Sequence, residues 1–97
     1  MAKGIFPKHH WRELLAHLGT EKSKFVEIEI TQYGVIVDHT MVSFITDTDS
    51  DYEFKVARAD LLKTDTEELV TLHYETDQLS VICEVAGTLV RMPAVAL

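Results

Sequence analysis

Hydrophobic and polar residues alternate through residues 68–92, a pattern that is typical of β-strands. Within 70–74 every second side chain is apolar. The alternation resumes after a polar break, at Leu79, Val81, Cys83 and Val85. Because a period of two places one face of a strand on a core, the segment predicts a three-stranded meander with turns at 76–78 and 86–87. Pro93 is predicted to end the last of these strands.

The first half of the chain contains the same pattern. Strands are predicted over residues 25–31, 35–37 and 41–46, the first of them with the most regular alternation. An acidic, solvated loop is expected at 47–51, followed by a short strand over 52–56.

Two segments have the character of helices. Residues 8–18 lie between Pro7 and Gly19, and this placement of proline and glycine is typical of the two ends of a helix. The apolar residues of this segment form one stripe, at Trp11, Leu14, Leu15 and Leu18. Residues 58–63 are good helix formers and predict a second, short helix.

These elements predict a fold of the α+β class. An antiparallel sheet of six to seven strands is expected, with one long N-terminal helix and a second short helix packed on one face. The length of 97 residues predicts a single domain, 1–97. One sheet face would remain uncovered, and the apolar tail 94–97 would need something to pack against.

The pattern also indicates a duplicated unit of one helix and three strands, with halves 1–50 and 51–97. The matching segments are Val26–Ile28 with Val70–Leu72, and Val35–Val37 with Leu79–Val81, each pair offset by 44 residues. Ile5 and Phe6 are expected to supply a short first strand that would match the strand at 52–56.

Charge and cysteine content narrow the functional classes. The net charge is −7, and the excess of basic residues within 1–24 makes the remainder more acidic still. Such a body repels nucleic acid and anionic membranes at long range and favours a basic partner or simple solubility. The single cysteine excludes an internal disulfide, and the absence of a long apolar run predicts a cytoplasmic protein.

One segment resembles a known family. Residues 54–62, followed by 70–72, 79–81 and 88–93, are similar to one βαβββ unit of the sliding clamps, the ring-shaped processivity factors of DNA polymerases. The resemblance implies two such units in the domain and positive charge on helices that face DNA. The basic residues at helical positions are Lys8, Arg12, Arg58 and Lys63. Because a clamp strings several domains together, a ring would require several copies of this chain.

Candidate sites for chemistry are few. His10, Glu13 and His17 share one helix face, but a metal site would need a further ligand, so a solvated face is expected, with no metal or cofactor. Asp47, Asp49 and Asp51 imitate the start of a calcium loop, yet the sixth and twelfth positions are Tyr52 and Arg58 where that loop needs glycine and glutamate. Without a nucleophile motif or a phosphate loop, the chain is predicted not to be an enzyme.

The sequence does not identify one function. The leading hypothesis is a small acidic, non-enzymatic interaction protein that acts as a homodimer or small homo-oligomer and binds a further protein. The alternatives are a clamp-like, DNA-associated assembly and a small-molecule-binding domain. The candidate interaction residues are Asp47, Asp49, Asp51, Lys8, Arg12, Arg58, Val95 and Leu97, and the candidate pocket residues are Trp11, Tyr33 and Tyr74.

Overall fold

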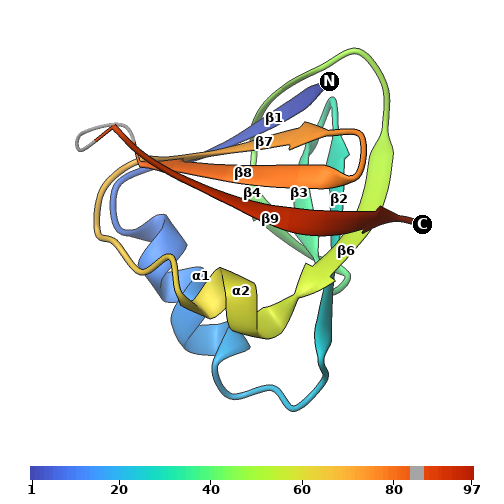
Figure 1. Cartoon of the computed structure of the whole chain (residues 1–97). Coiled ribbons are helices and arrows are strands. Elements are labelled where there is room, and N and C mark those ends of the chain that lie inside the picture. The colour runs from blue at the N-terminus through green and yellow to red at the C-terminus, as the bar shows by residue number, and fades with distance from the viewer. Residues whose placement is uncertain (84–86) are drawn as a thin grey trace.

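The computed structural model describes residues 1–83 and 87–97, which form a mostly β structure (Figure 1). The elements are β1 (Ala2–Phe6), α1 (His10–Leu18), β2 (Phe25–Thr31), β3 (Gly34–Val37), β4 (Thr40–Ser43), β5 (Ile45–Thr48), β6 (Tyr52–Ala57), α2 (Arg58–Leu62), β7 (Val70–Glu75), β8 (Gln78–Cys83) and β9 (Thr88–Ala96). The prediction of an α+β fold with six to seven strands and one long helix is therefore wrong. Nine strands are described, and α1 has only nine residues.

All strand pairs are antiparallel, in the order β4-β3-β2-β6-β9-β8-β7-β1-β5. The strands form two layers that share β9. Sheet A contains β5, β1, β7, β8 and residues 88–93 of β9, which pair with β8. Sheet B contains β4, β3, β2, β6 and residues 94–96 of β9, which pair with β6.

At two bends the chain passes directly from one sheet to the other, and these two crossings join the sheets. In β9 the bend follows Pro93, so this residue does not end the strand as predicted. It lies where β9 leaves β8 and joins β6, and Ala94 N there donates to Asp77 O at 3.0 Å. The second bend is at Phe44, which splits the predicted strand 41–46 into β4 and β5. The tail 94–97 is consequently not a free apolar tail, because most of it is paired in sheet B.

The two halves of the chain repeat one element order and exchange their first strands. Each half contains a strand, a helix, two strands and a bent strand, which is β4–β5 in the first half and β9 in the second. The first strand of each half pairs with the second strand of the other, β1 with β7 and β6 with β2. Even the register is equivalent: Phe6 lies opposite Val70, as Val56 lies opposite Val26.

The core lies between the two sheets and under the two helices, which share one side of the molecule (Figure 1). The apolar stripe of α1 is buried, and the Trp11 ring contacts Phe6 edge-on at 5.1 Å between centroids. The helix begins at His10 because His9 has a φ of 76°, outside the helical region. Gly4 permits close packing of the sheets, since a Cβ there would clash with Val35 Cγ2.

Arg58 joins the two helices from within the protein. The residue is only 6% exposed, and its side chain donates to Leu18 O at 2.8 Å and to Ser23 O at 2.6 Å. A cation at the last carbonyls of α1 satisfies acceptors that have no partner inside the helix. Arg12 makes a different kind of contact, because it is exposed and pairs with Asp65 and Glu67 on the connector between α2 and β7.

We predict that Arg58→Met lowers the free energy of unfolding by about 2–4 kcal/mol, because the carbonyls of Leu18 and Ser23 lose their buried donor. Arg12→Met is the matched control and should cost clearly less, because exposed ion pairs contribute little. Urea unfolding monitored by Trp11 fluorescence measures both variants. Equal losses in the two variants would contradict the assigned role of Arg58.

Candidate functional site

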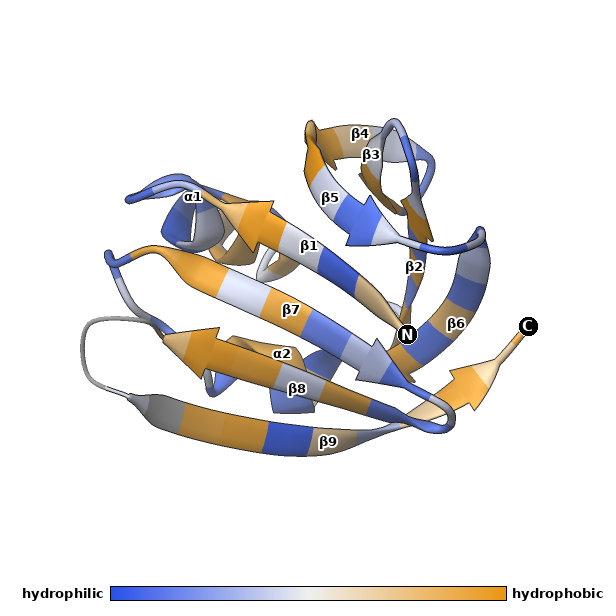
Figure 2. Ribbon diagram, turned by 90° about the horizontal axis from the view of Figure 1, so that it is seen from above, coloured by the Kyte–Doolittle hydropathy of each residue, from blue (hydrophilic) through white to orange (hydrophobic). Residues whose placement is uncertain are grey.

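The most distinctive surface feature is a pair of open sheet edges. Among the described residues, β4 pairs only with β3, and residues 88–93 of β9 pair only with β8. Figure 2 shows β4 and β9 on opposite sides of the molecule. The other terminal strand, β5, is partly covered, since Thr46 Oγ1 donates to Thr31 O at 2.7 Å. An open edge carries unpaired N–H and C=O groups that can pair with another strand.

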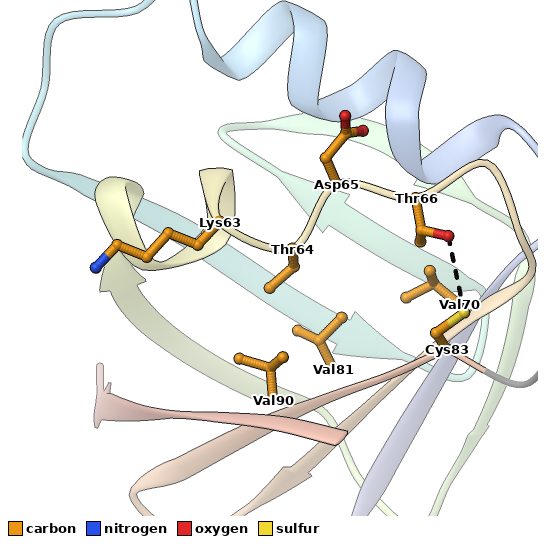
Figure 3. A pocket seen from close by; sticks show the side chains of 8 residues that line it. All are labelled: Lys63, Thr64, Asp65, Thr66, Val70, Val81, Cys83 and Val90. Carbon is orange, nitrogen blue, oxygen red and sulfur yellow. Dashed lines mark hydrogen bonds between the residues drawn. The ribbon is translucent and has the colours of Figure 1, made fainter. Parts of the chain in front are cut away.

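A hollow lies beside the open edge of β9, and we call it the β9 hollow (Figure 3). Its volume is about 220 Å³. It is lined by Lys63, Thr64, Asp65, Thr66, Val70, Val81, Cys83 and Val90. The connector after α2 forms one wall, and three valines of β7, β8 and β9 form the apolar part of the lining.

The hydroxyl groups in this hollow are already engaged. Thr64 Oγ1 accepts from Trp11 Nε1 at 3.1 Å and donates to Leu61 O at 2.6 Å. Thr66 Oγ1 accepts from Glu68 N at 3.2 Å and contacts Cys83 Sγ at 3.7 Å. The charged residues of the rim are turned elsewhere: Asp65 points toward α1, and Lys63 points outward (Figure 3). The hollow therefore suits an apolar group.

A second hollow, the β4 hollow, lies beside the other open edge. It has a volume of about 390 Å³ and lies between α1 and β4. Its lining consists of His10, Glu13, Leu14, His17, Thr40 and Val42. The helix period had placed the two histidines and Glu13 on one face, and the structure brings them to one hollow. Within residues 1–83 and 87–97, however, no group of three His, Cys, Asp or Glu side chains is arranged to hold a metal ion.

Large apolar side chains are exposed near both open edges. Near β4, Phe44 is 80% exposed and Met41 lies against Gly34 in the neighbouring strand. On β9, Leu89 is 47% exposed. Val95 and Leu97, both predicted interaction residues, are also exposed. Phe44 and Leu89 were missed by sequence reasoning, because the strand pattern alone does not show which strands lie at an edge.

The four predicted basic residues differ in burial and in ion pairing. Arg58 is buried and Arg12 is paired with two carboxylates. A hydrogen bond from Arg12 to Asp65 accordingly raises the pKa of the guanidinium. Lys8 and Lys63 are exposed. Of the four predicted helical cations, Lys8 and Lys63 lie just outside α1 and α2, and Arg12 and Arg58 make bonds within the protein. Fewer helical positive charges are therefore available to an external anion.

The acidic residues Asp47, Asp49 and Asp51 are exposed on β5 and the loop after it. Asp49 and Asp47 make different interactions. The Tyr52 hydroxyl donates to Asp49 at 2.8 Å and lowers the pKa of that carboxyl, and the N-terminal ammonium, 3.6 Å away, adds to this effect. Asp47 lies opposite Lys3 in the pairing of β5 with β1.

The predicted pocket of Trp11, Tyr33 and Tyr74 is not formed. Trp11 is fully buried and donates to Thr64. Tyr74 is also buried and stacks on Phe54 with ring centroids 4.0 Å apart. Tyr33 is exposed in the turn between β2 and β3. The first two residues serve the core, so the three aromatic side chains do not line a common site.

Cys83 is only half-buried and lines the β9 hollow, whereas the alternation predicted a buried hydrophobic side chain. Leu79 and Val81, in the same alternation, are buried. Val85 and part of the predicted turn at 86–87 lie outside the described residues. Because Cys83 is the chain's single cysteine, a thiol reagent would report on this hollow alone.

Sequence reasoning also missed a pair of carboxylates on the outer face of sheet B. Glu29 and Glu53 lie directly opposite each other on β2 and β6. A side-chain hydrogen bond between them raises the pKa of Glu29, and partial desolvation and repulsion by Glu53 and Asp51 act in the same direction. Glu27 and His39 line the adjacent shallow hollow. Only the register between the strands reveals this pairing.

Comparison with protein-family models, with curated proteins and with solved structures found no match. No helix within residues 1–83 and 87–97 is long and apolar enough to cross a membrane. The surface geometry is therefore the basis on which a function can be proposed.

We predict that Glu53→Gln stabilises the protein at neutral pH. A carboxyl with a raised folded-state pKa, here Glu29, favours folding at low pH, and this contribution is lost as the pH rises through that pKa. The melting temperature of the variant should exceed that of the wild type at pH 7, and the difference should shrink on acidification. Glu29→Gln should have a similar effect because it removes the same repulsion. A constant difference at every pH would contradict this explanation.

Proposed function

We propose that this protein is a non-enzymatic protein-interaction module that works as a homo-oligomer, with β4 of one copy pairing with β9 of the next. The observation that carries the proposal is the pair of open edges on opposite sides of the molecule (Figure 2). Strand addition satisfies the unpaired backbone groups of both edges at once. Exposed apolar side chains at or near these edges, including Met41 and Leu89, would be removed from water.

The contact would be heterologous, because β4 and β9 are different surfaces. Copies joined in this way form a closed ring if the rotation between neighbours closes, and an open filament if it does not. A head-to-tail assembly of several domains is also what the resemblance to sliding clamps implies. DNA binding is not carried forward, since Arg12 and Arg58 make their contacts within the protein.

Charge should control the strength of this assembly. Each copy carries a net charge of −7, so copies repel one another at long range. Moderate salt screens this repulsion over a Debye length of about 8–10 Å and leaves apolar contacts in place. The proposed assembly is therefore stronger at moderate salt than at low salt. We place the module in the cytoplasm, in keeping with its single cysteine and acidic surface.

We predict that Met41→Lys and Leu89→Lys each reduce the solution mass measured by size-exclusion chromatography with light scattering. A lysine on an edge strand opposes pairing because its charge would be desolvated in the contact. Phe25→Lys is the matched control: Phe25 is 47% exposed, as Leu89 is, but lies opposite Ala57 of β6 on β2, an interior strand between β3 and β6. It should leave the mass unchanged.

Mixing the two edge variants gives a sharper test. Met41→Lys retains an intact β9 edge and Leu89→Lys retains an intact β4 edge, so the mixture should form heterodimers and nothing larger. A wild-type protein that is monomeric at both low and moderate salt would refute the self-association.

A further inference from the structure

We infer that the β9 hollow is the receptor for one side chain of a second copy, and that this side chain is Val42 of the docked β4 strand. The inference rests on the proposed function, because it assumes that β4 and β9 meet. It adds the residue, the register and the chemistry of the contact.

The size of the hollow favours a side chain over a free ligand. Its volume of about 220 Å³ lies below the range of roughly 300–1,000 Å³ that is usual for small-molecule sites. Val70 and Val81 are buried in its lining, and the Thr64 and Thr66 hydroxyls are engaged within the protein. An apolar group of a few carbon atoms fits this lining without leaving a polar group unpaired.

The position of the hollow points to a strand on the β9 edge. Val90, on β9, lines the hollow and packs against the core, so the hollow adjoins the helix side of sheet A. A strand added to β9 would direct every second side chain to that same side. Such a side chain would lie over the hollow without further rearrangement.

The second copy's β4 supplies a suitable residue. Val42 packs partly against its own core and lines the β4 hollow together with Leu14 of α1, so it too faces the helix side. When β4 and β9 continue one sheet, the two helix sides coincide and Val42 faces the β9 hollow. The β4 hollow and the β9 hollow then join across the contact into one enclosed space.

Charges at the two rims are complementary. Glu13 lines the β4 hollow, and Lys63 lines the β9 hollow. Asp65 is the acidic residue among those that line the β9 hollow, and it pairs with Arg12 of its own chain. Docking would bring Glu13 of one copy near Lys63 of the next, a favourable pairing in a protein whose copies otherwise repel each other.

Disulfide trapping tests the assignment in a Cys83→Ser background, which removes the chain's single cysteine. Cys83 lies on β8, two strand spacings or about 10 Å from a strand docked on β9, and a disulfide spans at most roughly 7 Å between Cα atoms. Val90 lines the hollow from β9 itself, so Val42→Cys is combined with Val90→Cys. Oxidised glutathione at moderate salt should then give covalent dimers and larger species on a non-reducing gel. An internal bond is excluded by the opposite positions of β4 and β9 (Figure 2). Val42→Cys without Val90→Cys should lose the larger species and form at most the dimers that one thiol allows.

Ser50→Cys in place of Val42→Cys, in the exposed loop after β5, is the control for random collision with Val90→Cys. If the Val42→Cys and Val90→Cys pair cross-links no more than this control while light scattering still shows an oligomer, the assignment of Val42 to the β9 hollow is overturned and the assembly stands. If light scattering shows only monomer and no cross-links form, both the inference and the proposed function fail.

Discussion

The exchange of first strands between the two halves is the constraint on which the rest of the structure depends. β1 pairs with β7 and β6 pairs with β2, so neither half completes a sheet from its own strands. Each bent strand, β4–β5 or β9, then spans both sheets and closes the structure around one core. This arrangement places both helices on one side and leaves β4 and the first part of β9 open at opposite ends (Figures 1 and 2).

The sequence pattern correctly predicted those elements whose apolar side chains repeat with the period of a strand or a helix. The strand over 25–31 and the buried stripe of α1 follow from periods of two and 3.6 residues. Period does not reveal where a strand changes neighbours. Pro93 was wrongly expected to end a strand, because only the pairing with β6 shows that the chain continues in the sheet. The α+β prediction undercounted the strands because it joined β4 and β5 into one strand and gave β1 only two residues, whereas both short strands gain their stability from distant partners.

The candidate site likewise has some residues that local pattern brings together and others that only contacts between distant segments bring together. The helix period placed His10, Glu13 and His17 together, and they do line one hollow. The burial of Arg58 and the opposition of Glu29 and Glu53 depend on contacts between distant segments, so no local signal announces them. The hollow beside β9 also combines residues from the connector after α2 with residues of three strands. Such a site exists only once the long-range register is set.

Strand exchange has a consequence for the autonomy of each half. A segment such as 51–97 contains α2 and the meander β7-β8-β9, but β7 would lack the neighbour that β1 provides in the whole chain. Its own first strand, β6, would likewise have lost β2 as a partner. Two copies of such a segment can supply these strands to each other, since β6 occupies the place in its half that β1 occupies in the other. The fold thus has the form of two half-length units, alike in element order, that exchange strands and are joined by a covalent link.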